Sequence, residues 1–176
     1  MLAYFFVLFA VAIRFLPHPW QFTPVAASLL FFGARGSRRQ IWLPFVLLAA
    51  SDLALNKFVY NYPFTADQLV VWVWYAAILW LGTRLRGHEK PLPIIGAALA
   101  SSVSFFLVSN FTVWLAGTMY PMNWTGLVTC YEAAVPFFRH TLEGDLLFAI
   151  AMFATPVALH SLAGMLNREA GPTAAA

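Results

Sequence analysis

The stretch LPIIGAALASSVSFFLVSNFTVWLA, residues 92–116, decides the fold class because it is apolar, uncharged and long enough to cross a bilayer as a helix. Five further apolar runs cover residues 2–15, 22–34, 41–55, 69–81 and 146–166. The pattern predicts an all-α polytopic membrane protein, a compact bundle of six transmembrane helices. Runs 22–34 and 41–55 are short for full spans, and 22–34 fits either a tilted helix or a re-entrant segment.

The composition supports this class. Of the 176 residues, 61% are hydrophobic and 10% are charged, whereas a soluble domain has roughly 25% charged residues. These values exclude a soluble enzyme, a disordered chain and a basic nucleic-acid-binding domain. We expect one transmembrane domain over residues 1–168 and a disordered cytoplasmic tail over residues 169–176.

Basic residues mark one side of the predicted membrane bundle. Seven of the ten lie in three segments that six spans would place together: Arg35, Arg38, Arg39, Arg84, Arg86, Lys90 and Arg168. Because Lys and Arg collect in cytoplasmic loops, this side is predicted to be the cytoplasm. Both termini are then cytoplasmic.

The three connections on the predicted outer side, residues 16–21, 56–68 and 117–144, are rich in aromatic residues and proline. One interpretation is an interfacial aromatic belt, although a belt normally follows both interfaces. The other interpretation is a pocket for a flat, partly apolar small molecule. Both remain open from the composition of the loops.

Polar residues inside the apolar runs need partners. Asp52 is predicted to pair with either Arg14 or Lys57, as a structural ion pair or as part of a ligand or proton site. Asn110 needs hydrogen-bond partners, which a neighbouring helix would supply.

Small residues recur at helical spacing in the fifth run. Gly96 and Ala100, and Ala97 and Ser101, show the small-xxx-small spacing that permits close helix packing in lipid. The neighbour is either another helix of this chain or a partner subunit.

The connection 117–144 carries most of the remaining polar residues. Residues 126–135 are predicted to form a short helix that ends at Pro136. Asp145 is expected to stand at the N-terminus of the last helix, where a carboxylate is favourable.

No catalytic or cofactor motif is present in the sequence. The spacing of Cys130 and His140 matches no closed zinc pattern, even with His18 and Asp52 as further ligands. P-loop, G-x-S-x-G and HExxH motifs are absent. We therefore predict no enzyme, no metal and no cofactor, and any ATP-driven step would belong to a partner.

Several motifs in order resemble an uncharacterised bacterial family of integral membrane proteins. That family is in turn similar to the substrate-binding (S) components of energy-coupling factor (ECF) vitamin transporters. The matching pieces are HPWQFTPVAASLLFFGA (18–34), LLAASDLAL (47–55), FFLVSNFTVW (105–114), MNWTGLVTCYEAAVPFF (122–138) and TLEGDLLFA (141–149).

The resemblance implies six helices and a vitamin-like substrate held at the outer face. It also implies that the protein works either alone or together with a membrane scaffold subunit and ATPases. The first run, FFVLFAVAIRF, lacks the A-x-x-x-A pattern used for scaffold contact in the ECF family. The predicted substrate-binding residues are Trp20, Tyr60, Asn110, Trp124, Cys130, Tyr131, Glu132 and Asp145.

Two other functions remain open from the sequence. The chain fits a structural or accessory subunit of a larger membrane complex, which would explain its small-residue face and apolar surface. An intramembrane enzyme would use Cys130, His140 or Asp52.

Overall fold

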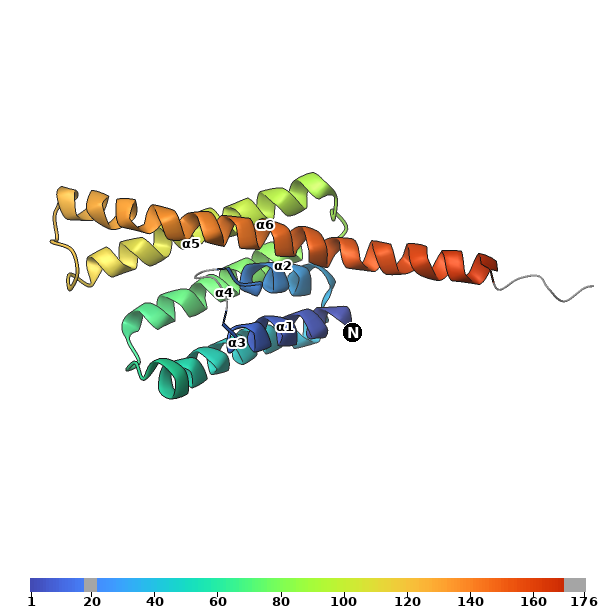
Figure 1. Ribbon diagram of the computed structural model, residues 1–176, viewed down its shortest axis with the longest axis horizontal. Coiled ribbons are helices and arrows are strands. Elements are labelled where there is room, and N and C mark those ends of the chain that lie inside the picture. Colours follow the sequence, from blue (N-terminus) through green and yellow to red (C-terminus); the bar gives the residue numbers. More distant parts are fainter. Residues whose placement is uncertain (18–21, 170–176) are drawn as a thin grey trace, which may run out of the picture.

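The protein folds into a bundle of six α-helices, seen in a computed structural model that describes residues 1–17 and 22–169 (Figure 1). The helices are α1 (Leu2–Ile13), α2 (Val25–Arg35), α3 (Trp42–Leu55), α4 (Ala66–Arg84), α5 (Pro91–Leu115) and α6 (Trp124–Glu169). A 3-10 turn, η1 (Arg38–Gln40), precedes α3, and a π-helical turn, η2 (Asn56–Tyr60), extends it. The all-α prediction with six helices is confirmed.

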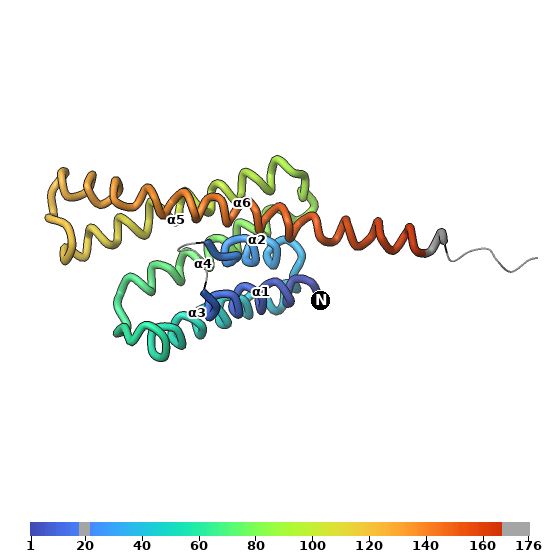
Figure 2. Tube along the Cα trace, viewed as in Figure 1, coloured from blue at the N-terminus to red at the C-terminus, as the bar shows by residue number. Residues whose placement is uncertain are grey.

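Successive helices run in opposite directions, so α1 begins and α6 ends at the same end of the bundle (Figures 1 and 2). The α2–α3 and α4–α5 connections, together with Arg35 and Arg84 at the ends of α2 and α4, hold six of the basic residues and lie at this end as well. Whereas α6 continues past them to Glu169, these two basic segments lie together at this end, as predicted from charge. We call this the basic end of the bundle.

Among the described residues, four segments are long and apolar enough to cross a membrane: Arg38–Tyr60, Ala66–Arg84, Pro91–Leu115 and Trp124–Leu166. Helices α1 and α2, with 12 and 11 residues, are only about 18 and 16 Å long. A hydrocarbon core is roughly 30 Å thick. Six helices are present, but α1 and α2 are each shorter than a full span.

Helix α2 forms the centre of the bundle. Every residue from Val25 to Ala34 is buried, and α1, α4, α5 and α6 all pack against it. A short helix enclosed by protein is the setting in which a chain can turn back inside a membrane. The structure shows this run as a short helix enclosed by other helices of the chain.

Two glycines bring α2 and α4 into backbone contact near the basic end. A Cβ on Gly33 would meet the Cα of Gly82 at 2.7 Å, and a Cβ on Gly82 would meet the Cα of Leu30 at 2.9 Å. Arg86 then donates hydrogen bonds to the carbonyls of Gly33 (2.7 Å) and Gly36 (3.0 Å). A cation suits the C-terminus of a helix such as α2.

Two of the predicted outer connections are shorter in the structure than the sequence predicted. Residues 56–60 continue α3 as η2. The predicted bounds 117–144 are wrong because α6 begins at Trp124. Pro136 lies inside α6 and does not end a helix. A proline removes one backbone donor, and neighbouring helices in a membrane bundle allow such a break. Asp145 is consequently not at a helix N-terminus but far inside α6.

The small-residue face of α5 is confirmed for one pair only. Ala97 and Ser101 are buried, whereas Ala100 is exposed and a Cβ on Gly96 would meet nothing within 4 Å. The close neighbours of α5 are α4 and α6 of the same chain. At the C-terminus, α6 extends to Glu169, and the rest of the predicted tail, residues 170–176, lies outside the described residues.

Candidate binding cavity

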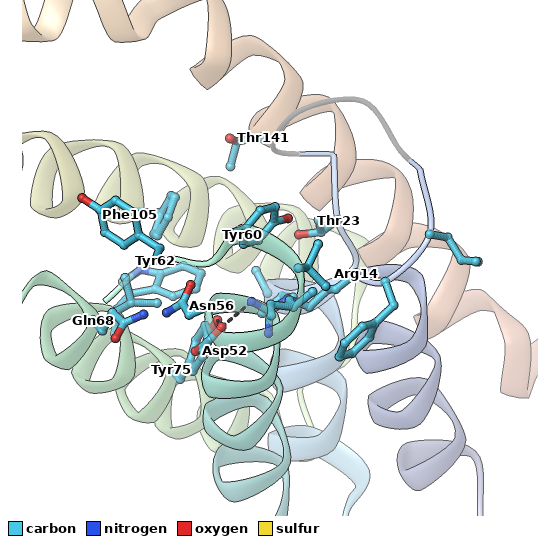
Figure 3. Close-up of a pocket in the computed structure, with 18 of the residues that line it drawn as sticks. Arg14, Thr23, Asp52, Asn56, Tyr60, Tyr62, Gln68, Tyr75, Phe105 and Thr141 are labelled. Carbon is cyan, nitrogen blue, oxygen red and sulfur yellow. Dashed lines mark hydrogen bonds and ion pairs between the residues drawn. The ribbon is translucent and has the colours of Figure 1, made fainter. Parts of the chain in front are cut away.

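A cavity of about 1090 Å³ lies beyond the tips of α1 and α2, toward the end opposite the basic loops (Figure 3). Helices α2 to α6 and the segment directly after α1 contribute to its wall. It is lined by Arg14, Phe15, Leu16, Pro17, Thr23, Val25, Ala26, Asp52, Leu55, Asn56, Val59, Tyr60, Tyr62, Gln68, Val71, Trp74, Tyr75, Phe105, Thr141 and Asp145. Its volume is at the upper end of the range for small-molecule sites, roughly 300–1,000 Å³.

The short first two helices explain why the cavity exists. Helix α1 ends at Ile13 and α2 begins at Val25, while η2 carries the α3 segment on to Tyr60 and the α5–α6 pair runs further still. The longer helices therefore form walls around a space that α1 and α2 do not fill. The residues directly after α1, Arg14 to Pro17, line this space.

An ion pair between Arg14 and Asp52 forms that base (Figure 3). Asp52 also accepts hydrogen bonds from the indole N–H of Trp72 (2.8 Å) and the hydroxyl of Tyr75 (3.3 Å). Arg14 donates to the Ser51 hydroxyl as well. Of the two predicted partners for Asp52, Arg14 is confirmed. Each charge is matched by the other and has further hydrogen bonds. The ion pair is therefore a structural contact that joins the end of α1 to α3.

A second carboxylate, that of Asp145, lies in the wall formed by α6. The residue is only 4% exposed, and its Oδ2 accepts a hydrogen bond from the Ser102 hydroxyl of α5 at 2.7 Å. Thr141 lies one turn earlier in α6 and also lines the cavity. This carboxylate pairs with no Arg, Lys or His in the part of the chain that the structure describes.

Two amide side chains in the wall have unused polar atoms. The Nδ2 of Asn56 and the Oε1 of Gln68 are buried and have no hydrogen-bond partner among residues 1–17 and 22–166. A buried donor and acceptor left in this state are unfavourable unless a ligand or water meets them. Both groups are therefore positioned to bind the polar edges of an occupant.

The predicted site residues fall into separate groups. Tyr60 and Asp145 line the cavity, whereas Trp124 and Glu132 are exposed near the start of α6. Trp20 lies outside the described residues. The structure brings two of the predicted residues to one cavity and places two others away from it.

Asn110, Cys130 and Tyr131 meet in the outer part of the α5–α6 pair. The Cys130 thiol donates to the Asn110 carbonyl at 3.4 Å, and the Tyr131 hydroxyl donates to the Leu107 carbonyl at 2.7 Å. The Asn110 amide donates to the Phe106 carbonyl of its own helix at 2.8 Å. The contacts of Cys130 and Tyr131 join α6 to α5, whereas the Asn110 amide is satisfied within its own helix and not, as predicted, by a neighbouring one. None of the three residues lines the cavity.

The sequence analysis missed most of the polar wall. Asn56, Gln68 and Thr141 were not singled out, and Tyr75 lies in a run that was considered only for its length. The available signal was the shortness of the first two apolar runs. A bundle in which two helices stop early leaves space beside the residues that follow the third run.

No metal site is indicated by the described residues, which contain no group of three or more His, Cys, Asp and Glu. Residues 1–166 match a family of unknown function (DUF6580), so the chain belongs to that family. No curated protein and no solved structure matches the chain.

Proposed function

We propose that this family member is a membrane-embedded binding protein for an aromatic, vitamin-like small molecule. The protein is a transport or uptake component and not an enzyme, in keeping with its resemblance to ECF S components. The ligand enters the cavity from the side opposite the basic loops. That side is the outside of a bacterial inner membrane, and both termini are cytoplasmic. The cavity beyond α1 and α2 is the observation that carries this proposal.

The lining of the cavity supports a ligand with a flat ring. Trp74 of α4 packs against Phe105 of α5 with ring centroids 4.9 Å apart and ring planes tilted by 55°, and Tyr60 adds a third aromatic side chain. Aromatic walls with a few polar groups are typical of small-molecule sites. The unused amide atoms of Asn56 and Gln68 add hydrogen-bonding capacity.

The first experiment tests whether the cavity is open to water from the outer side. Cys130 is replaced by Ala, and Thr141→Cys is introduced in the cavity wall. Intact cells are treated with a membrane-impermeant sulfonated maleimide, which we expect to label Thr141→Cys. Ser28→Cys in the fully buried α2 is the matched control and should stay unlabelled. A Thr141→Cys variant as unreactive as the control would contradict the proposal.

The second experiment tests ligand binding itself. Purified protein is screened for thermal stabilisation by a panel of aromatic vitamins and their precursors. We expect at least one compound to stabilise the wild type and to lose this effect in Thr141→Trp, which fills the cavity. His140→Trp adds the same side chain at the neighbouring, exposed position and should behave as the wild type. Equal stabilisation of both tryptophan variants would place binding elsewhere.

A second candidate function rests on the C-terminal part of α6, which projects past the basic end of the bundle (Figure 1). With 46 residues the helix is about 69 Å long. Its exposed apolar residues there include Val157, Leu162 and Met165. Such a surface suits contact with a scaffold or another membrane subunit. Stoichiometric co-purification of one membrane protein, lost in Leu162→Arg, would support an accessory-subunit role; a monomer in mild detergent would oppose it.

A further inference from the structure

Asp145 is the most buried charged residue of the cavity wall. It is 4% exposed and lies deep within α6, a segment long and apolar enough to span a membrane. Ionisable residues in such segments are costly and usually serve a function. The base of the cavity already has a matched ion pair, so Asp145 needs an explanation of its own.

The hydrogen bonds of Asp145 leave most of its capacity unused. An ionised carboxylate offers about four acceptor positions, and the Ser102 hydroxyl supplies one donor, at 2.7 Å. The same hydroxyl also lies 3.2 Å from the Ala98 carbonyl, so its single proton has a competing acceptor. Within the part of the chain that the structure describes, no second side chain donates a hydrogen bond to Asp145.

The charges that line the cavity do not balance. Its charged residues are Arg14, Asp52 and Asp145, and Arg14 is already paired with Asp52. Lys57 is not among the lining residues, and its ammonium lies over the Phe58 ring, 5.4 Å from the ring centroid. Among the described lining residues, Asp145 in its ionised form therefore has no matching positive charge.

We propose that Asp145 binds a positively charged nitrogen of the ligand, so that the cavity selects cationic aromatic compounds over neutral ones of the same shape. This inference rests on the proposed binding function and names the class of ligand. A cation in the cavity would supply the charge that the protein does not. Trp74 and Phe105, which share the wall, would face the cationic ring and add cation–π attraction.

The experiment compares matched compounds that differ in charge. The pairs are thiamin and thiochrome, 1-methylnicotinamide and nicotinamide, and 1-methylquinolinium and quinoline, each cation being named first. Affinities are measured by equilibrium dialysis at pH 8 with the full chain in phosphatidylcholine nanodiscs, whose zwitterionic lipid limits adsorption of cations. For at least one pair we expect the cation to bind at least ten-fold more tightly than its neutral partner.

Two substitutions of carboxylates in α6 separate the site from the surface. Asp145→Asn is expected to weaken binding of that cation at least ten-fold and to change binding of the neutral partner less than two-fold. Glu143→Gln removes the same charge from an exposed residue that pairs with Arg139, and it should change neither affinity. Ser102→Ala keeps the carboxylate and should keep the preference for the cation. The wild-type comparison of each pair stands even if Asp145→Asn fails to fold.

Three results would overturn the inference: no cation binds, neutral partners bind as tightly as cations, or Asp145→Asn retains the preference. Neutral ligands that bind while cations do not would remove the inference and leave the proposed function standing. Failure of the proposed function would give a different result: the Thr141→Cys variant would not react with the maleimide. The two failures are thus separated by independent measurements.

Discussion

The half of the bundle beside the basic loops is packed backbone to backbone, whereas the other half surrounds a cavity of about 1090 Å³. In the packed half, Gly33 and Gly82 let α2 and α4 touch, and Arg86 binds the last carbonyls of α2. In the open half, the amides of Asn56 and Gln68 have polar atoms without partners. Tight packing at one end holds the helices in place while the other end stays unfilled.

The charged residues of the two halves differ in the same way. At the basic end, Arg35 pairs with Glu89 and Arg86 caps α2, so these basic side chains have partners in the fold besides marking its orientation. In the cavity half, the Ser102 hydroxyl is the one side-chain hydrogen-bond donor to Asp145 among the described residues. The comparison separates residues that close the structure from residues left available to a ligand, and substitutions in each half test it.

The largest effect is expected for Gly82→Leu. Its Cβ alone would lie 2.9 Å from the Cα of Leu30, so α2 and α4 must move apart, at a cost of about 3 kcal/mol or more in the free energy of unfolding. Gly96→Leu adds the same side chain where nothing lies within 4 Å and should be nearly neutral. Unfolding by SDS in mixed micelles measures both, and equal stability of the two variants would contradict the close contact.

The next effect concerns the base of the cavity. Arg14→Met leaves the carboxylate of Asp52 without its cation, which should cost roughly 3 kcal/mol because the pair is largely buried. In the double variant Arg14→Met/Asp52→Asn, the amide oxygen can replace the acceptor of Trp72, and the amide nitrogen can donate to the Tyr75 hydroxyl. We expect the double variant to be more stable than Arg14→Met by about 1 kcal/mol or more. Strictly additive losses in the same SDS titration would show that the two side chains are not coupled.

A smaller effect is expected at the C-terminus of α2. Arg86→Met removes two hydrogen bonds to the carbonyls of Gly33 and Gly36 and should cost about 1–2 kcal/mol in the free energy of unfolding. Arg38→Met deletes an equal charge from an exposed position at the same end. It should cost less than about 0.5 kcal/mol. If both variants lose the same stability, Arg86 contributes through its charge alone and not through the cap.

The sequence predicts those features of the structure that depend on nearby residues, and it misses those that depend on packing between distant segments. The long uncharged run 92–116 and the grouped basic residues depend on local composition, and they predict helix number and alternation correctly. Pro136 also carries a strong local signal, for a helix end, yet α6 continues through it. Packing of α6 along α5 outweighs one missing backbone donor, and that packing is not visible in a local window.

The site was harder to predict than the fold for the same reason. For Asp52 the sequence predicted a basic partner, either Arg14 or Lys57, because unpaired charges in a span are rare, and the structure shows Arg14. The cavity residues Asn56, Gln68 and Thr141 come from three helices and are brought together by the early ends of α1 and α2. Resemblance to another family instead pointed to Cys130 and its neighbours.

Substitution of Cys130 is expected to have the smallest effect on stability. It also distinguishes a site in the cavity from a site around Cys130. It is 2% exposed and contacts the Asn110 carbonyl outside the cavity, so Cys130→Ala should cost only about 1 kcal/mol in stability. Binding of any stabilising compound should be unchanged. Tyr60→Ala, in the cavity wall, should weaken that binding at least about ten-fold, or about 1.4 kcal/mol. The opposite result, with binding lost in Cys130→Ala and kept in Tyr60→Ala, would move the site to the outer part of the α5–α6 pair.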